Sequence, residues 1–227
     1  MAINYVSDYG ITLKEFKNNP VILQEIQEAT MSTEGKLTRL DSVKKLYKDL
    51  QSSIPRAEVA KHVEYVHDRV PTAVGVGSFR RGCKYSRDID ILVREPIDIV
   101  LSKLGKYVVD VVTKGNVKAM IVVRLGRHGK HRLMDILRTT STSYPFAVLY
   151  MTGSKQFNIV MRMKAKRLGM KLNEIGLFKN DEMVPGLVTE KDVFAALGMD
   201  YIQPKDRTSD AMKIKNKAKR AAAKKAK

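Results

Sequence analysis

Two aspartates, Asp88 and Asp90, open an apolar run that ends at Val93. If this run is a β-strand, side chains two residues apart point to the same face, so the two carboxylates stand side by side. Neighbouring carboxylates repel each other unless a cation lies between them, and hard oxygen ligands suit Mg²⁺. The spacing therefore predicts a divalent-metal site at the beginning of this strand.

A Gly-Ser turn at Gly77 and Ser78 shortly precedes the acidic pair, and Arg80 and Arg81 follow the turn. Glycine lets the backbone approach an anion closely, and a helix that begins at such a turn presents free N–H groups to phosphates. Guanidinium groups match phosphate oxygens. A Gly-Ser turn, a solvated arginine pair and an exposed Asp-x-Asp sequence are each common alone. In this order they indicate phosphoryl transfer of the nucleotidyltransferase type.

A site that holds two metal ions needs a further carboxylate from another strand. Asp135 lies inside the apolar run 133–137, and a buried carboxylate is normally paired, hydrogen-bonded or bound to metal. A salt bridge to Arg132 or Arg138 is the ordinary alternative. Asp110 is a second acid within an apolar run, and the residues alone leave the choice between it and Asp135 open.

The composition is that of a globular protein. The chain has 227 residues, of which 44% are hydrophobic, so it can bury a core. No stretch reaches the roughly 18 uninterrupted apolar residues of a membrane span, and the N-terminus lacks the basic and apolar blocks of a secretory signal. Cys83 is the single cysteine, which excludes an internal disulfide and fits a reducing compartment. We therefore expect a soluble, intracellular protein.

A formal net charge of +18 predicts a polyanionic partner, with nucleic acid first and an anionic membrane second. The stretch from Lys213 to Lys227 carries eight of these positive charges and no acid, which leaves +10 on the rest of the chain. Residues 209–227 are of low complexity and are expected to be disordered in isolation. This tail either adds salt-dependent contacts to DNA phosphates or serves as a nuclear-localisation signal or solubilising extension.

The pattern of apolar residues predicts an α+β protein in which helices flank a mixed β-sheet. We expect helices over 55–70, 97–104, 157–168 and 190–197, strands over 73–76, 89–93, 107–112, 118–125 and 132–137, and a short β pair at 172–178 and 182–188. The chain divides into a helical N-terminal segment (1–50), a sheet unit with the acidic residues (51–144), a small α+β unit (145–208) and the basic tail (209–227).

Several motifs in a fixed order, between about residues 52 and 209, resemble those of family X DNA polymerases of the polymerase-beta type. They are Gly-Ser-Phe-Arg-Arg-Gly at 77–82, Asp-Ile-Asp at 88–90, Arg-Leu-Met-Asp-Ile-Leu at 132–137, Leu-Tyr-Met-Thr-Gly-Ser at 149–154, Phe157-Asn158, Met161-Arg162, Leu-Asn-Glu-Ile-Gly-Leu-Phe at 172–178, Thr-Glu-Lys-Asp-Val-Phe at 189–194 and Tyr-Ile-Gln-Pro-Lys-Asp-Arg at 201–207. The resemblance implies a nucleotidyltransferase palm on the mixed sheet, a partial DNA-binding subdomain within residues 1–50, and a C-terminal subdomain that binds nucleotide and template.

The same resemblance implies a role for each matching residue. Asp88 and Asp90 would bind both metal ions, and Asp135 would bind the catalytic ion and help to deprotonate the primer 3′-hydroxyl. The incoming nucleotide would be bound by Gly77, Ser78, Arg81 and Arg56 at its phosphates, by Tyr150, Met151 and Gly153 at its sugar, and by Asn158 at its base. The resemblance assigns Arg162 to the template strand, and we further expect DNA contacts from the basic residues Lys155, Lys164, Arg127 and Lys130.

These roles imply a template-directed DNA polymerase that adds dNMP to a primer 3′-hydroxyl and fills short gaps in DNA repair. Two Mg²⁺ ions would be its cofactors, with Mn²⁺ able to substitute. Its partners would be a dNTP and gapped or primer–template DNA, and it would act as a monomer without a membrane, in the nucleus, at a site of viral DNA replication or repair, or in the cytoplasm. The rival hypotheses are a template-independent nucleotidyltransferase (a terminal transferase or an RNA-tailing enzyme) and a non-catalytic DNA-end-binding factor.

The chain departs from the family pattern at several positions. Leu133 and Leu137 stand where the family has arginines, Met151 replaces a phenylalanine and Lys155 replaces an acidic residue. Tyr150 and Met151 would otherwise be ordinary core residues. The family's lyase domain has no counterpart in these motifs, so the chain looks like the reduced enzymes of some large DNA viruses.

Overall fold

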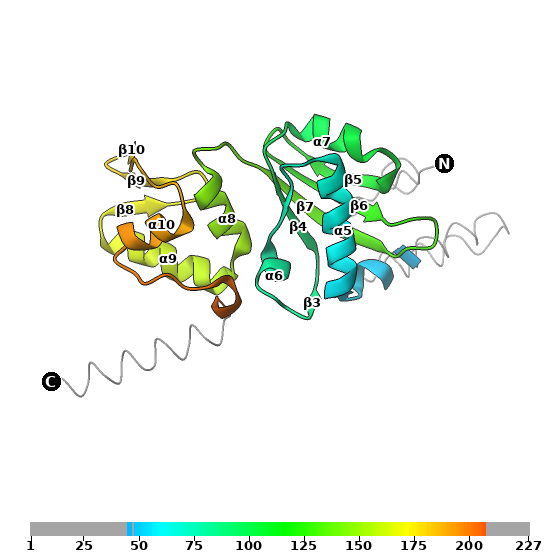
Figure 1. The fold of residues 1–227 in the computed structure, drawn as a ribbon, viewed down its shortest axis with the longest axis horizontal. Coiled ribbons are helices and arrows are strands. Elements are labelled where there is room, and N and C mark those ends of the chain that lie inside the picture. The colour runs from blue at the N-terminus through cyan, green and yellow to red at the C-terminus, as the bar shows by residue number, and fades with distance from the viewer. Residues whose placement is uncertain (1–44, 47, 208–227) are drawn as a thin grey trace, which may run out of the picture.

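A five-stranded mixed β-sheet forms the centre of the larger unit in this computed structural model, which describes residues 45, 46 and 48–207 (Figure 1). Its strands lie in the order β2 (Val74–Gly75), β4 (Ile89–Val93), β7 (His131–Arg138), β6 (Lys118–Arg124) and β5 (Val108–Lys114). β4 and β7 run parallel, whereas the other neighbouring strands are antiparallel. The expected mixed sheet and α+β class are confirmed.

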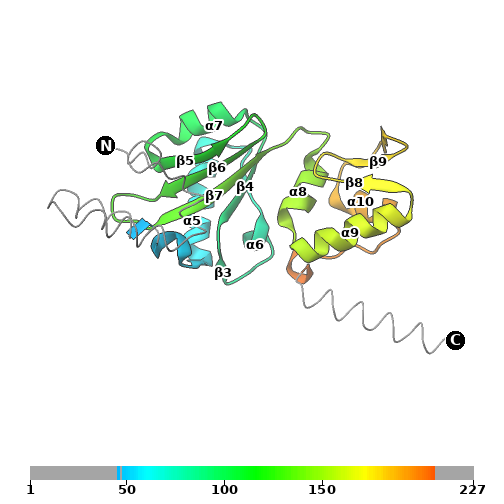
Figure 2. The same cartoon turned by 180° about the vertical axis from the view of Figure 1, so that it is seen from behind.

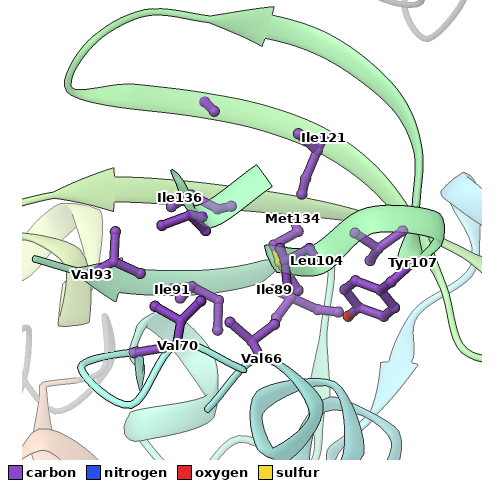
Figure 3. Packing of buried hydrophobic residues seen from close by; sticks show 14 of the residues in the cluster. Val66, Val70, Ile89, Ile91, Val93, Leu104, Tyr107, Ile121, Met134 and Ile136 are labelled. Atoms are coloured by element: carbon purple, nitrogen blue, oxygen red, sulfur yellow. The ribbon is translucent and has the colours of Figure 1, made fainter. Parts of the chain in front are cut away.

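Helices α5 (Arg56–Arg69) and α7 (Ile97–Leu104) cover one face of this sheet (Figures 1 and 2). In α7 the buried residues Ile97, Val100 and Leu104 recur at helical spacing, so one side of the helix packs on the strands. Figure 3 shows the resulting core, with Val66, Val70, Ile89, Ile91, Val93, Leu104, Tyr107, Ile121, Met134 and Ile136 labelled. Burying each large aliphatic side chain contributes about 1.5–3 kcal/mol to folding, so β4 and β7 are held rigidly from this side.

Three short elements lie near β2 and β4, at one side of the sheet. α6 (Gly77–Arg80) follows β2, and β1 (Ile54–Pro55) pairs with β3 (Tyr85–Ser86). No strand was expected at Ile54–Pro55 or at Tyr85–Ser86. Their pairing brings the first residue of α5, Arg56, to the loop after α6, where its backbone N–H donates to the carbonyl of Lys84 at 2.9 Å.

The described residues among 45–51 are helical, and Arg132 of β7 ties them to the sheet. This guanidinium is 1% exposed. It donates to the carboxylate of Glu58 at 2.6 and 2.9 Å, to the carbonyl of Asp49 at 3.1 Å and to the hydroxyl of Ser52 at 2.7 Å. A buried charge must be paired, and the last turn of the N-terminal helix supplies part of that pairing.

Most of the expected helical segment 1–50 and the whole basic tail 209–227 lie outside the described residues, so both stay predictions. Within the described part, the four helices expected after residue 54 are present and begin and end within two residues of the expected bounds. The same part of the chain contains no helix that is both long and apolar enough to cross a membrane.

The smaller C-terminal unit has its own core between helices and a short antiparallel sheet. The helices are α8 (Tyr144–Thr152), α9 (Lys155–Arg167) and α10 (Glu190–Ala196), and the strands lie in the order β10 (Glu182–Met183), β9 (Leu177–Lys179) and β8 (Met170–Leu172). Single turns of 3-10 helix, η1 (Gly105–Tyr107) and η2 (Pro204–Asp206), follow α7 and α10 in the chain. Phe157, Met161 and Phe194 are among the buried residues of this second core.

The expected strand over 172–178 is wrong, because the chain turns back within it. β8 and β9 occupy its two ends and pair antiparallel. The side-chain Oδ1 of Asn173 accepts hydrogen bonds from the backbone N–H groups of Ile175 and Gly176, both at 2.9 Å. An asparagine bonded to the backbone two or three residues further on closes a turn. The strand expected over 182–188 likewise shortens to β10.

An ion-pair network joins the two units where α6, α8 and α10 meet (Figure 1). Arg80 donates to both carboxylate oxygens of Glu190, at 3.1 and 2.7 Å, and to the hydroxyl of Thr152 at 2.7 Å. Arg207 is fully buried over the ring of Phe157 and donates to the same carboxylate at 2.6 Å. Burial by itself would raise the pKa of Glu190, but the hydrogen bonds from the two arginines outweigh it and keep this pKa below its usual range.

Replacing Glu190 with glutamine is expected to lower the free energy of unfolding by about 1.5–3 kcal/mol, because charge-assisted hydrogen bonds lose their anion. Thermal or denaturant unfolding at fixed salt measures this change. The matched control is Glu182→Gln on β10, an exposed residue at which the same substitution should change stability by no more than about 0.5 kcal/mol. Equal stability of the two variants would show that the network does not support the junction.

Candidate active site

β4 and β7 bring two of the predicted catalytic carboxylates together. In the parallel register, Asp90 lies directly beside Asp135. The residues just before them, Ile89 and Met134, belong to the core under α5 and α7, so the carboxylates project from the opposite face of the sheet. Asp88 comes immediately before β4. The fold therefore gathers the three acids at one place.

Gly77 packs against the carboxylate of Asp90. Its φ is +58°, and a Cβ atom at this position would lie 1.7 Å from Oδ2 of Asp90. The backbone N–H of the preceding Val76 donates to the carbonyl of Asp90 at 2.9 Å. The turn needs glycine both for its conformation and for space. The predicted phosphate turn thus touches the predicted metal ligand.

The charge of this cluster changes the acidity of Asp90. Burial and the neighbouring carboxylates of Asp88 and Asp135 raise its pKa from 3.8 to about 7, although Arg81 and Lys118 act in the opposite direction. The structure therefore concentrates more negative charge here than the nearby cations neutralise.

Asp135 forms an ion pair with Lys118 of β6, whose Nζ lies 3.6 Å from Oδ2. The two arginines that the sequence offered as alternatives contact other groups, since Arg132 binds the N-terminal helix and Glu58 while Arg138 donates to a backbone carbonyl at 3.4 Å. Asp110, the competing acid, lies on β5 and is separated from β7 by β6. Strand order therefore selects Asp135 as the third acid.

The donor atoms suit a hard divalent cation, since all three predicted ligands are carboxylates. In the described part of the chain, no three His, Cys, Asp or Glu side chains converge closely enough to hold a metal ion as they stand. Burial first, and then the charges of Asp88 and Asp135, disfavour the ionised form of Asp90 and raise its pKa. A bound cation would stabilise the ionised form, so the donor set fits a metal ion around which the side chains close.

Two predicted phosphate ligands lie at the turn that contains Gly77. The hydroxyl of Ser78 donates to the hydroxyl of Ser86 at 2.7 Å. Arg56 donates to the carbonyl of Phe79 at 2.5 Å, and its guanidinium lies 4.4 Å from the centre of the Phe79 ring. The pairing of β1 with β3 thus brings Arg56 to the turn from a distant part of the sequence.

Arg81 reaches from this turn to the segment between α8 and α9. Its Nη1 donates to the carbonyl of Thr152 at 2.5 Å, and a Cβ atom at Gly153 would lie 3.3 Å from the same nitrogen. Arg80 is instead bound to Glu190. Of the two arginines after the turn, Arg81 therefore remains the predicted phosphate ligand.

The predicted sugar and base contacts gather around the end of α8. Tyr150 is 40% exposed, whereas Met151 packs in the apolar cluster between α8 and the sheet. The amide of Asn158 donates to the carbonyl of Tyr150 at 2.8 Å. Arg162 lies 5.5 Å from the centre of the Tyr150 ring and forms an ion pair with Glu174 at 3.6 Å. Tyr150, Asn158 and Arg162 also line one small pocket.

The other predicted DNA-binding residues do not all lie together. Lys155 opens α9 and stands seven residues before Arg162, so the two share a side of the helix. Lys164 lies on another side of α9. Arg127 and Lys130 are exposed in the β6–β7 loop, at the end of the sheet beside the N-terminal helix. Any DNA contacts of these residues therefore involve several separate parts of the surface.

Two family models match the chain. The model described as DNA polymerase beta palm matches residues 53–173, and the model described as DNA polymerase beta thumb matches residues 147–208. The palm match alone covers more than half of the 227 residues. The chain belongs to the polymerase beta family of DNA polymerases. It is a family X DNA polymerase, and the resemblance seen in its motifs is confirmed.

Two relatives match this family X polymerase over different shares of their own length. It is 28% identical over 171 residues to the Repair DNA polymerase X of African swine fever virus, a match that covers 72% of this chain and 95% of the viral one. It is 33% identical over 196 residues to DNA polymerase lambda of Rattus norvegicus, a match that covers 72% of this chain but only 34% of the rat protein. The match thus spans nearly all of the viral polymerase and about a third of the rat protein.

Two crystal structures of Leishmania infantum polymerase beta resemble this family X polymerase over both units. The ternary P/T complex has a TM-score of 0.69 and 26% identity, and the match covers 90% of this chain and 91% of the other. The ternary gap complex has a TM-score of 0.70 and 25% identity, with coverage of 89% and 83%. The palm and thumb fold of the chain is therefore that of polymerase beta.

Sequence reasoning missed several residues that the fold of this polymerase brings to the site. Ser86 accepts a hydrogen bond from the hydroxyl of Ser78 in the phosphate turn. Thr152 accepts hydrogen bonds from both Arg80 and Arg81. Glu190 forms an ion pair with Arg80. Lys118 reaches Asp135. The alternation of side chains along β6 would place Lys118 on the same face as the acids only if the register of β6 against β7 were already known.

Proposed function

We propose that this family X polymerase copies a DNA template across short gaps and adds dNMP to a primer 3′-hydroxyl. The main support is the register that sets Asp90 beside Asp135, with Asp88 just before β4 and Gly77 packed on the carboxylate of Asp90. Oxygen ligands for cations therefore lie in contact with a turn suited to phosphates. We further propose that the protein works as a monomer and takes a dNTP as its substrate.

Family X polymerases generally use divalent metal ions. We propose two Mg²⁺ ions here, with Mn²⁺ able to substitute, held by Asp88, Asp90 and Asp135. When bound, such ions increase the acidity of the primer hydroxyl and neutralise the charge that develops on the transferred phosphoryl group and on pyrophosphate. Burial and the neighbouring acids raise the pKa of Asp90 to about 7, so a bound cation would favour its ionised form.

In the proposed reaction, the primer 3′-oxygen forms a bond to the α-phosphorus of the dNTP. The bond from that phosphorus to the oxygen that bridges to the β-phosphorus breaks, and pyrophosphate leaves with the electron pair. The proton of the 3′-hydroxyl passes to the carboxylate of Asp135. Ser78, Arg81 and Arg56 hold the β- and γ-phosphates, exchanging their present intramolecular partners for phosphate oxygens.

We assign the remaining substrate contacts to the segment from α8 to α9. Tyr150, Met151 and Gly153 would line the sugar, and Asn158 would reach the edge of the base. Arg162 would contact the template after leaving its exposed ion pair. Such a pair is weak, typically worth about 0–1 kcal/mol, so a DNA phosphate or base edge can replace it.

The proposed task in repair rests on the relatives and on charge. The viral relative is named Repair DNA polymerase X, and one similar structure is a ternary gap complex. The net charge of +18 favours binding to polyanionic DNA by release of counterions, so the affinity for DNA should fall steeply as salt rises. Arg127 and Lys130 would contribute to this binding outside the active site.

Primer extension with a labelled primer tests the proposal. The full chain is incubated with Mg²⁺ and each single dNTP on a one-nucleotide gapped duplex, on an open primer–template and on the single-stranded primer, and the same series is run with NTPs. We expect the dNTP that matches the template to be added in the gap, and EDTA to abolish the addition. Mn²⁺ should restore activity after the chelator has been saturated.

Two other outcomes would each favour a rival hypothesis, and a third would contradict only the preference for gaps. Addition of any nucleotide to the single-stranded primer would make the protein a template-independent transferase. Binding of DNA ends without addition in either Mg²⁺ or Mn²⁺ would leave a non-catalytic DNA-end-binding factor. Equal activity on the gap and on the open primer–template would retain the polymerase but contradict the preference for gaps.

A further inference from the structure

The surroundings of Asp135 on its own strand are apolar. Leu133 and Leu137 stand two residues to either side of Asp135, so their side chains project from the same face of β7. They are only 5% and 7% exposed. β7 therefore offers no cation next to Asp135 on this face, although one further carboxylate, Asp90, lies directly beside it.

Lys118 supplies a cation from the other neighbouring strand. In the β6–β7 register Met120 lies opposite Asp135 and Lys118 lies opposite Leu137, so Lys118 is the diagonal neighbour of Asp135 on the same face. Its Nζ is 3.6 Å from Oδ2 of Asp135. The side chain of Lys118 is 56% exposed and that of Asp135 is 18% exposed, so the ammonium group approaches from the open side, where a primer would lie.

Three arginines near the acidic cluster hydrogen-bond to other groups. Arg132 holds the N-terminal helix and Glu58, and Arg81 donates to the backbone of the α8–α9 segment. Arg138 donates to the backbone carbonyl of Arg94, which directly follows β4. The ion pair with Lys118 is thus well placed to orient the carboxylate of Asp135.

We propose that Lys118 is a positioning residue of the polymerase reaction, which orients the carboxylate of Asp135 toward the primer 3′-oxygen and balances part of the charge of the three acids. This inference rests on the proposed function, because it concerns the residue assigned to receive the proton. Lys118 keeps its ammonium group largely in water, and an ion pair of this kind at 3.6 Å contributes little to stability. The role of Lys118 should therefore be visible in the rate of the chemical step and not in the stability of the fold.

The test compares Lys118→Met, Lys118→Arg and the control Lys103→Met. Lys103 is exposed on α7, which packs on the opposite face of the sheet, so its replacement removes the same charge far from the acids. Single-turnover extension on a one-nucleotide gap, with the dNTP concentration varied, separates the maximal rate from the dNTP affinity. Fluorescence anisotropy measures the affinity for the gapped DNA, and thermal unfolding monitors the fold.

For Lys118→Met we expect a maximal rate about 10–100-fold below the wild type, as is typical when the partner of a metal-binding carboxylate is removed. The DNA affinity and melting temperature should match those of Lys103→Met, and Lys118→Arg should recover most of the rate. An unchanged rate, or a loss confined to DNA affinity, would overturn the proposal and make Lys118 a DNA contact at most. A lowered melting temperature without rescue by arginine would overturn it in favour of a structural role. If the wild type itself adds no nucleotide while Lys118→Met folds normally, the proposed function fails, and this inference fails with it.

Discussion

An Asp90→Asn variant is expected to lose primer extension by a factor on the order of 10³ or more, because a neutral amide cannot bind the cations that stabilise the transition state. The same variant should be more stable than the wild type at pH 8 in the absence of divalent ions. Ionised Asp90 is buried beside Asp88 and Asp135, and asparagine removes that unfavourable charge. Activity and stability should therefore change in opposite directions, as is common at functional sites.

The sign of the pH effect follows from the raised pKa of Asp90. Its carboxyl has a pKa of about 7 in the fold and an ordinary value of 3.8. The folded state thus binds a proton more tightly than the unfolded state, and the stability of the metal-free wild type should fall as pH rises from about 4 to about 7. The full shift from 3.8 to about 7 corresponds to a loss of about 4 kcal/mol of stability above pH 7. Asp90→Asn should lack this pH dependence, and Mg²⁺ should raise the stability of the wild type at pH 8.

Asp110→Asn is the matched control for this prediction. Asp110 is also an acid in an apolar run, but it lies on β5, away from the acidic cluster. Its side chain accepts a hydrogen bond from the N–H of Val111 at 2.8 Å, which an asparagine oxygen can also accept. Extension should survive in this variant. Loss of activity in Asp110→Asn together with retention in Asp90→Asn would contradict the assignment of the site.

Gly77→Ala is expected to reduce extension on the order of 10²-fold and to destabilise the fold by about 2–5 kcal/mol. The new Cβ atom would lie 1.7 Å from Oδ2 of Asp90, so the turn, the carboxylate or both must move. Displacement of either by about 1 Å is enough to misplace the phosphates relative to the metal ligands. Gapped-primer extension and denaturant unfolding measure the two effects.

Gly82→Ala distinguishes the steric overlap with Asp90 from the cost of a positive φ. Gly82 also has a positive φ, +79°, but a Cβ atom there would meet nothing within 4 Å. Both substitutions carry the left-handed penalty of about 1–2 kcal/mol, and only Gly77→Ala adds contact with Asp90. If the two variants lose equal activity, the close approach of Gly77 to Asp90 is not what the site requires.

The chemistry of the candidate site was predictable from one short stretch of the chain. Asp88, Asp90 and the Gly-Ser turn are close in the chain, and their meaning depends on residue type and short spacing. Alternation and helical periodicity likewise located the strands of the central sheet and the helices α5 and α7, although not the short strands β1 and β3. These properties are local, so they could be predicted without knowledge of which segments meet. The turn at Asn173 was missed because the apolar residues around it continue the pattern of a strand.

Which distant residues lie beside that stretch depends on the tertiary structure. Asp135 and Asp110 have similar sequence surroundings, and strand order alone places Asp135 beside Asp90. Lys118 reaches Asp135 because β6 pairs with β7 in one register, and a slip of one residue would turn it to the other face. Arg80 forms an ion pair with Glu190 because the C-terminal unit packs against α6. Register and packing minimise the free energy of the whole fold, and no short stretch of sequence contains that information.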